Sequence, residues 1–302
     1  MNWRYKAALQ YAFSSLPKGE DLNYVFQKYV TRTLSNEPAG FESVMNNARN
    51  HTSAVRRHLS VPVSQAVFYE FGAGSLLAIP LALFCSGIDH QILVDIRRLV
   101  KPRLVNITVK SLQNLGPEAG LQRKPSEWPG SGAFSKFALW LRTCFGIEYR
   151  APSDARKTGL EPASVDVITS TNTLEHIPPH DIQAILIECR RILRDHGVMS
   201  FRVDYSDHYK SFDRSISAYN FLRYSDRQWR WFNPPLHYQN RLRHRDYVDL
   251  FKRTGFEIVE EMPGSVSEPD LELISRMPLA TRFWEYSVPD LAVQNSFFLL
   301  RK

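Results

Sequence analysis

The chain has 302 residues, of which 43% are hydrophobic and 23% are charged, and its formal net charge is +7. This composition can build a full apolar core, which excludes an intrinsically disordered chain and a small disulfide-stabilised peptide. The length predicts either one large domain or one domain with a substantial cap, and we expect the second arrangement. The positive charge favours acidic partners without identifying them.

Cysteine spacing and the lengths of apolar runs indicate the cellular compartment of the protein. Cys85, Cys144 and Cys189 lie far apart with no CxxC pair, which argues against a disulfide framework, a zinc ribbon and an iron–sulfur cluster and favours a reducing compartment. The longest apolar run, residues 76–85, is about half of the roughly 20 residues that a membrane span needs. The amino-terminal residues do not form the apolar core of an export signal. We therefore expect a cytoplasmic protein without a transmembrane segment, for which peripheral membrane contact and the oligomeric state stay open.

Residues 1–60 predict a helical cap. Apolar residues recur at spacings of three and four between Phe41 and Leu59, which is typical of one buried helix face. Prolines and a glycine divide the segment into short helices, too few for an independent domain but suitable for covering a pocket.

Residues 61–302 predict the main domain, which begins with a βαβ unit. Residues 67–71 form a β-rich run that ends in Gly72-Ala73-Gly74, a helical stretch follows, and residues 91–95 form a second strand. This order implies a parallel sheet with helices on its faces.

The alternation of strands and helices continues to the carboxyl terminus. Further strands are expected at residues 146–149, 165–169, 198–203, 256–260 and 295–300, with helices at 182–193 and 244–254. Segments at about 97–145 and 206–240 fit this alternation less well and are interpreted as insertions. The expected fold is therefore α/β, with a Rossmann-like sheet of seven mostly parallel strands, a helical amino-terminal cap and an aromatic-rich insertion after the fifth strand.

The glycine turn after the first strand is a candidate ligand site. Gly72 and Gly74 let a ligand approach the backbone, and the following helix presents free N–H groups. The third glycine of a nicotinamide-binding fingerprint is replaced by Leu77, which argues against a dinucleotide. Asp95 closes the second strand, where a carboxylate can accept both hydroxyls of a ribose, although a surface turn residue is the alternative.

Short motifs follow one another in a recognisable order along the chain. They occupy residues 69–74, 94–95, 153–155, 165–168, 173–177, 244–247 and 252–258. This series resembles that of the class I S-adenosylmethionine-dependent methyltransferases over roughly residues 65–205 and 240–302. The resemblance implies an enzyme that transfers a methyl group from S-adenosylmethionine.

The resemblance also implies a set of cofactor contacts at the ends of the first four strands. In chain order they are Glu70, Phe71, Gly72, Ala73 and Gly74, then Asp95 and Ile96, then Asp154 and Ala155, and then Thr171 and Asn172. By this resemblance the first group lines the methionine end of the cofactor and the second group binds the ribose. The third group meets the adenine, and the last approaches the sulfonium side.

Three residues are candidate catalytic groups. Methyl transfer is an in-line displacement, so a protein aligns donor and acceptor and takes a proton if the acceptor is a hydroxyl. His176 follows the fourth strand, and Asp204 and His208 follow the fifth, all at the carboxyl edge of the sheet where ligands bind. Structural roles are equally open, because His176 can cap the next helix and Asp204 and His208 can belong to a solvated loop.

The residues around His176 are the candidates for a metal site. Glu175 and His176, with His180, suggest metal ligands, but Pro178 and Pro179 break the helical spacing and no further residue is seen to complete the shell. We therefore expect no metal.

The acceptor site is expected in the aromatic-rich insertion. Its aromatic and basic side chains suit sugars, bases and phosphates, and the expected contacts are Tyr205, Tyr209, Tyr219, Arg223, Trp229, Tyr238 and Arg241. The alternative is a cap that packs its aromatic residues on the sheet and solvates its arginines.

The expected function is O-methylation of a small or glycan acceptor, which can be anionic. The overall pattern is similar to bacterial methyltransferases associated with cell-surface polysaccharides and natural products. The alternatives are N-methylation of a small amine and a non-catalytic regulatory protein that binds S-adenosylmethionine. Nucleic-acid methylation ranks lower, because the basic residues gather in one insertion without a recognised binding module.

Overall fold

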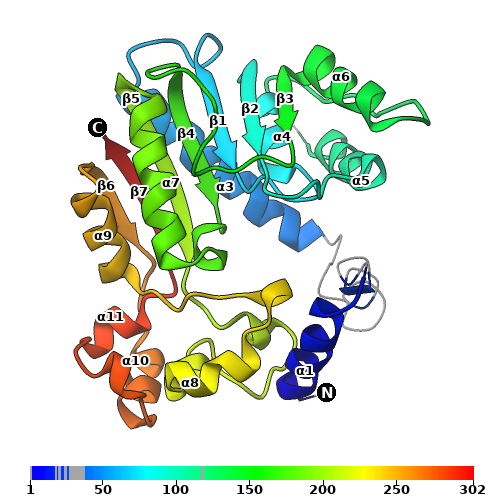
Figure 1. Cartoon of the computed structure of the whole chain (residues 1–302). Coiled ribbons are helices and arrows are strands. Elements are labelled where there is room, and N and C mark those ends of the chain that lie inside the picture. Colours follow the sequence, from blue (N-terminus) through cyan, green and yellow to red (C-terminus); the bar gives the residue numbers. More distant parts are fainter. Residues whose placement is uncertain (1, 18, 20–21, 24–25, 27–37, 117–118) are drawn as a thin grey trace.

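A seven-stranded sheet forms the centre of the computed structural model, which describes residues 2–17, 19, 22–23, 26, 38–116 and 119–302. The strand order is β3-β2-β1-β4-β5-β7-β6 (Figure 1). The strands are β1 (Val67–Phe71), β2 (His90–Val94), β3 (Ile147–Arg150), β4 (Val165–Thr171), β5 (Leu193–Asp204), β6 (Glu257–Pro263) and β7 (Asn295–Arg301). The five neighbouring strands β3, β2, β1, β4 and β5 pair in parallel, and β7 is antiparallel to both β5 and β6. The predicted α/β sheet of seven mostly parallel strands is confirmed.

Helices cover both faces of the sheet. The longer ones are α1 (Trp3–Ser14), α3 (Pro38–His58), α4 (Ala78–Cys85), α5 (Pro102–Gln113), α6 (Phe134–Phe145), α7 (Pro179–Ile192), α9 (His244–Arg253) and α10 (Glu268–Arg276). Helices α3 to α6 share a core with Phe68 and Val167, whereas α7 and α9 share one with Tyr69 and Ile168. Successive strand residues point to opposite faces, so β1 and β4, which have helices on both sides, are buried over most of their length. No helix in the described ranges is long and apolar enough to cross a membrane.

The two segments interpreted as insertions have different structures. Segment 97–145 holds α5 and α6 and forms the crossover between β2 and β3. Segment 206–240 holds α8 (Asp226–Trp229) and several single turns. The short helix α11 (Val288–Ala292) and α10 lie between β6 and β7, where the sequence predicted no helix.

A third apolar core lies outside the sheet layers. It joins Trp3 of α1 to Tyr209, Trp229 and other aromatic residues of the insertion, and to Ile274 of α10. The ring of Trp3 lies 4.7 Å from that of Phe232. The predicted cap of residues 1–60 therefore has two parts, because α1 packs on the insertion and α3 packs on the sheet; residues 1, 18, 20–21, 24–25 and 27–37 of it lie outside the described residues.

Candidate active site

The turn after β1 leaves its backbone accessible. Gly72 and Gly74 have φ angles of +76° and +72°, a conformation that glycine adopts without steric cost. A Cβ atom on Gly72 would lie 2.2 Å from Thr173 Cγ2, whereas one on Gly74 would have no described atom within 4 Å. Gly72 thus packs against the segment that follows β4, and Gly74 leaves space for a ligand.

Asp95 is buried beside this turn. Its side chain is 5% exposed. Burial raises the pKa of Asp95 to about 6, although the neighbouring donors Tyr149, Ala73 and Gly74 lower it. The buried Oδ2 atom has no hydrogen-bond partner within the described part of the chain. An orphaned acceptor next to an open glycine turn fits a ribose hydroxyl, since such an atom needs a donor.

The loop after β3 meets the loop after β2. The Ser153 amide donates to the Asp95 carbonyl (2.9 Å), which brings Asp154 and Ala155 to this edge. The carboxylate of Asp154 pairs with Arg156, which also binds Asp181. Ile96 is 64% exposed, so an apolar side chain next to Asp95 is available to a flat base. The adenine contacts of these residues stay predictions.

Glu70 lies within the sheet rather than on its surface. It is 3% exposed, and the hydroxyl of Thr169 on β4 donates to its Oε2 atom (3.0 Å). Burial raises the pKa of Glu70 to about 8 although this hydrogen bond lowers it. A positively charged ligand group at this edge would favour the ionised form.

The end of β4 is tied to α3. His51 is fully buried and its ring nitrogens lie 2.9 Å from Thr171 Oγ1 and 2.7 Å from Ser200 Oγ. Asn172 has a φ angle of +50°, and its side-chain oxygen accepts a hydrogen bond from Arg202. The sequence predicted Thr171 and Asn172 at the sulfonium side; the structure places Thr171 at the end of β4, which pairs with β1, and Asn172 directly after it.

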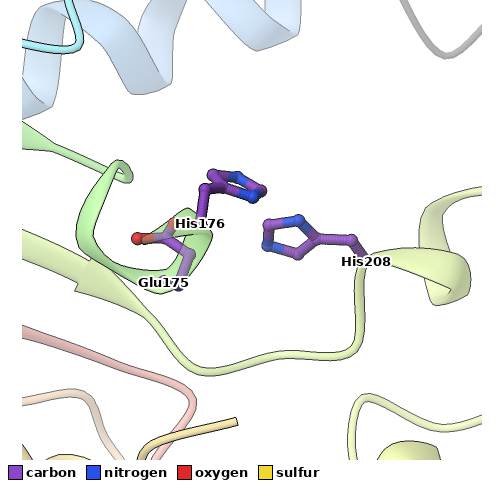
Figure 2. Close-up of side chains that lie close together, drawn as sticks. All are labelled: Glu175, His176 and His208. Atoms are coloured by element: carbon purple, nitrogen blue, oxygen red, sulfur yellow. The ribbon is translucent and has the colours of Figure 1, made fainter. Parts of the chain in front are cut away.

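The three candidate catalytic residues come together. The imidazole centroids of His176 and His208 lie 4.9 Å apart, and the two side chains point toward each other with their rings tilted (Figure 2). His208 Nε2 lies 3.5 Å from Asp204 Oδ2, and Asp204 Oδ1 accepts hydrogen bonds from the amide and hydroxyl of Ser206. Although burial raises it, the pKa of Asp204 is lowered overall by His208 and Ser206.

His176 is held by the end of the insertion. Its Nδ1 atom lies 2.8 Å from the carbonyl oxygen of Tyr238. The Asn240 amide donates to the Glu175 carbonyl (2.9 Å), which fixes the insertion on the short turn η3 (Leu174–His176). Burial and the neighbouring His208 lower the pKa of His176 to about 4, so this imidazole is neutral at physiological pH.

Glu175 lies in the site although it was not predicted as a site residue. Its carboxylate is buried, and neither oxygen has a hydrogen-bond partner in the described ranges. Burial and the charge of Asp204 raise the pKa of Glu175, and backbone amides nearby offset this only in part. The interpretation that nothing completes a cluster around Glu175 and His176 was wrong, because the β5 loop supplies His208. His180 instead lies 3.5 Å from Asp181 and its side chain is 80% exposed.

Two further residues near the site were missed. Tyr149 on β3 lies near Asp95 and influences its pKa, and its position at the end of the third predicted strand was an available signal. The buried Nε2 atom of His237 has no hydrogen-bond partner among the described atoms, and its ring lies 6.1 Å from that of His208. Nothing in the local sequence pattern of His237 pointed to this edge.

Most of the expected acceptor contacts have packing roles. Tyr205, Tyr209, Tyr219, Trp229 and Arg241 are all at most 3% exposed. The hydroxyl of Tyr209 donates to the Phe232 carbonyl and that of Tyr219 to the Ala292 carbonyl. Arg241 donates to two carbonyls and binds Asp226. A small cap needs its own core, and these side chains build it. Of the expected set, Arg223 is exposed and Tyr238 is half-buried.

The chain is similar to known methyltransferases in sequence and to solved structures in fold. A family model described as a methyltransferase domain matches residues 87–261, more than half of the chain. The fold is similar to that of the YcgJ protein from Bacillus subtilis (13% identity, 83% of this chain and 97% of that chain covered, TM-score 0.43). It is also similar to an S-adenosylmethionine-dependent methyltransferase from Mesorhizobium loti (13% identity, 84% and 98% covered, TM-score 0.40). No curated protein matches the sequence.

Proposed function

The chain belongs to the methyltransferase domain family, and from this premise we propose that it methylates an oxygen atom of a sugar, glycan or other small acceptor. It is an enzyme and S-adenosylmethionine is its methyl donor. The cofactor supplies an electrophilic methyl group on a positively charged sulfur. The remaining questions concern which residues hold it and which acceptor atom receives the methyl group.

The cofactor residues of the proposal lie along one edge of the sheet. Asp95 accepts the ribose hydroxyls at its unpartnered Oδ2 atom, and the backbone of residues 72–74 lies under the methionine portion. The family match begins at residue 87, so the contacts of the glycine turn are supported by its geometry alone.

The pairing of His208 with Asp204 carries the proposal of an oxygen acceptor. A hydroxyl must lose its proton as the carbon–oxygen bond forms, whereas an amine can attack in its neutral form. A histidine oriented by a carboxylate is the usual arrangement of a general base, and Asp204 lies 3.5 Å from His208. The neutral His176 faces the same point.

The proposal extends to the acceptor's charge and to the cell compartment. Arg223, Arg227 and Arg230 are exposed on the insertion, which supports an anionic acceptor such as a phosphorylated sugar. A role in polysaccharide formation in the cytoplasm is consistent with the three free cysteines. The same arginines support peripheral contact with an anionic membrane.

An acceptor screen with labelled donor tests this proposal. Hydroxyl and amine acceptors of matched size are compared with the wild-type enzyme and with His208→Ala. We expect product only with hydroxyl acceptors, and a fall in kcat of about 100-fold or more in the variant, because a general base contributes 10²–10⁴-fold. His180→Ala is the control, since His180 is exposed and lies outside the cluster. Methylation of amines alone, or full turnover by His208→Ala, would contradict the proposal.

A further inference from the structure

Glu175, His176 and His208 gather at one point although they come from two loops. Glu175 and His176 follow β4, and His208 opens the turn η4 (His208–Ser211) after β5. Their ligating atoms all lie within 4.8 Å of one another (Figure 2). Since β4 and β5 are parallel neighbours, the loops that follow them leave the sheet side by side.

Glu175 is the observation that points to a ligand. Its side chain is 3% exposed, and both carboxylate oxygens are buried without a hydrogen-bond partner within the described ranges. A buried carboxylate with no donor is costly, and native proteins satisfy such groups with a proton, a donor or a cation. The two neighbouring imidazoles make the cation the best match, because they offer further lone pairs to the same point.

Each histidine is oriented by a group that leaves one nitrogen free. The Tyr238 carbonyl can only accept, so it holds a proton on His176 Nδ1 (2.8 Å) and leaves the Nε2 lone pair available. Asp204 Oδ2 lies 3.5 Å from His208 Nε2, which favours a proton there and a lone pair on Nδ1. Carbonyls and carboxylates orient metal-bound histidines in this way.

We propose that Glu175, His176 and His208 bind a divalent transition-metal ion of the zinc class. Two imidazoles and one carboxylate are a ligand set of catalytic zinc and of other first-row metals, and three protein ligands leave at least one position open. Donor atoms on a tetrahedral zinc ion lie about 3.3 Å apart, given bonds of about 2.0–2.1 Å. The imidazoles therefore rotate inwards on binding, and neither ring is fully buried.

The proposed metal site gives the acceptor a specific chemistry, and this step rests on the proposed function. A hydroxyl oxygen of the acceptor binds the open position and loses its proton to water, because a bound metal ion lowers the pKa of its oxygen ligand. The new carbon–oxygen bond then forms as the carbon–sulfur bond of the donor breaks, and the sulfonium becomes a neutral thioether. In the metal-bound enzyme His176 and His208 hold the ion, and the base role proposed above for His208 applies to the enzyme without the ion.

Metal titration of the full-length protein tests the site. The chelator-treated protein is titrated calorimetrically with Zn²⁺, and the visible spectrum of bound Co²⁺ reports the ligand geometry. We expect one ion per chain and a rise in melting temperature on binding. Glu175→Gln and His208→Ala are expected to weaken binding at least tenfold, whereas His180→Ala binds as the wild type does. Circular dichroism confirms that each variant is folded.

Three outcomes would overturn the metal site: no stoichiometric binding by the wild type, unchanged affinity in folded His208→Ala, or equal loss in His180→Ala. Binding of S-adenosylhomocysteine to the same samples separates this proposal from the proposed function. Metal binding without nucleoside binding supports the site and contradicts the proposed function, and the reverse result overturns the metal site alone.

Discussion

The ionisation of Asp95 is expected to control cofactor binding at acidic pH. Burial raises its pKa to about 6, and only the carboxylate accepts from two ribose hydroxyls. We expect the affinity for S-adenosylhomocysteine to fall about tenfold for each pH unit well below 6. Calorimetry from pH 5 to 8 measures this, with Asp195→Asn, at an exposed position, as the control. An unchanged pH dependence in Asp95→Asn would exclude Asp95 as its source.

The same shift has a consequence for stability. Because the folded protein holds the Asp95 proton up to about pH 6 and the unfolded chain releases it near 3.8, stability falls as the pH rises between these values. At pH 7 the ionised form destabilises the ligand-free protein by about 3 kcal/mol. Asp95→Asn is therefore expected to raise the melting temperature without ligand while weakening cofactor binding. A lower melting temperature of Asp95→Asn without ligand would show instead that the carboxylate stabilises the fold.

Gly72 and Gly74 form a matched pair of predictions. An alanine at position 72 would have a positive φ angle, and its Cβ atom would lie 2.2 Å from Thr173 Cγ2. We therefore expect Gly72→Ala to lose about 2–4 kcal/mol of stability. Alanine at Gly74 meets only the backbone strain, about 1–2 kcal/mol, but its Cβ enters the space assigned to the ligand. Urea unfolding and nucleoside titration of both variants distinguish the two effects. Equal stability losses, or nucleoside binding intact in Gly74→Ala, would contradict these roles.

Among the elements, α3 is joined to the sheet by a buried histidine. Burial, with Arg202, lowers the pKa of His51 to about 3, whereas an unfolded histidine titrates near 6.5. As the pH falls below about 6.5, the unfolded chain takes up a proton that the folded chain does not. Stability from this residue is therefore lost at up to about 1.4 kcal/mol per pH unit. We expect the free energy of unfolding, measured by urea titration, to depend less steeply on pH in His51→Gln than in the wild type between pH 6.5 and 4.5. Identical slopes against pH would refute the assignment to His51.

Helix α1 is expected to hold the insertion in place. Trp3 is 3% exposed and packs against Tyr209, Trp229 and Phe232. Trp3→Ala removes about 3–5 kcal/mol of packing from a core that the sheet does not share. Hydrogen exchange should accelerate across residues 206–232 while β1 to β5 keep their protection. Uniform acceleration over the whole chain would show instead that the cap and the sheet unfold as one unit.

At the scale of the whole molecule, the sheet was predictable because each strand has its own local pattern. Residues 165–169 place the β-branched residues Val165, Val167 and Ile168 close together, and the glycine turn and Asp95 mark where strands end. Parallel strands bring such ends to one edge, so the shared location of Asp95, His176 and Asp204 followed from the sequence.

Contacts between loops were not predictable in this way. His208 reaches Glu175 only because of how the β5 loop turns, and no local pattern records that turn. The acceptor contacts predicted in the aromatic insertion were mostly wrong for a related reason. Aromatic residues are common both in apolar cores and in binding sites, so residue type alone does not distinguish the two. Tyr205 and Tyr219 are therefore distinguished from Arg223 only by their burial in the folded chain.

We propose that one edge of the sheet holds S-adenosylmethionine between the glycine turn and the histidine cluster. A crystal structure with S-adenosylhomocysteine tests this binding mode. We expect ribose hydroxyls on Asp95 Oδ2, the amino-acid portion over residues 72–74, and the sulfur facing Thr171 and His176. A nucleoside bound elsewhere, or an Asp95 carboxylate turned away from it, would refute this binding mode.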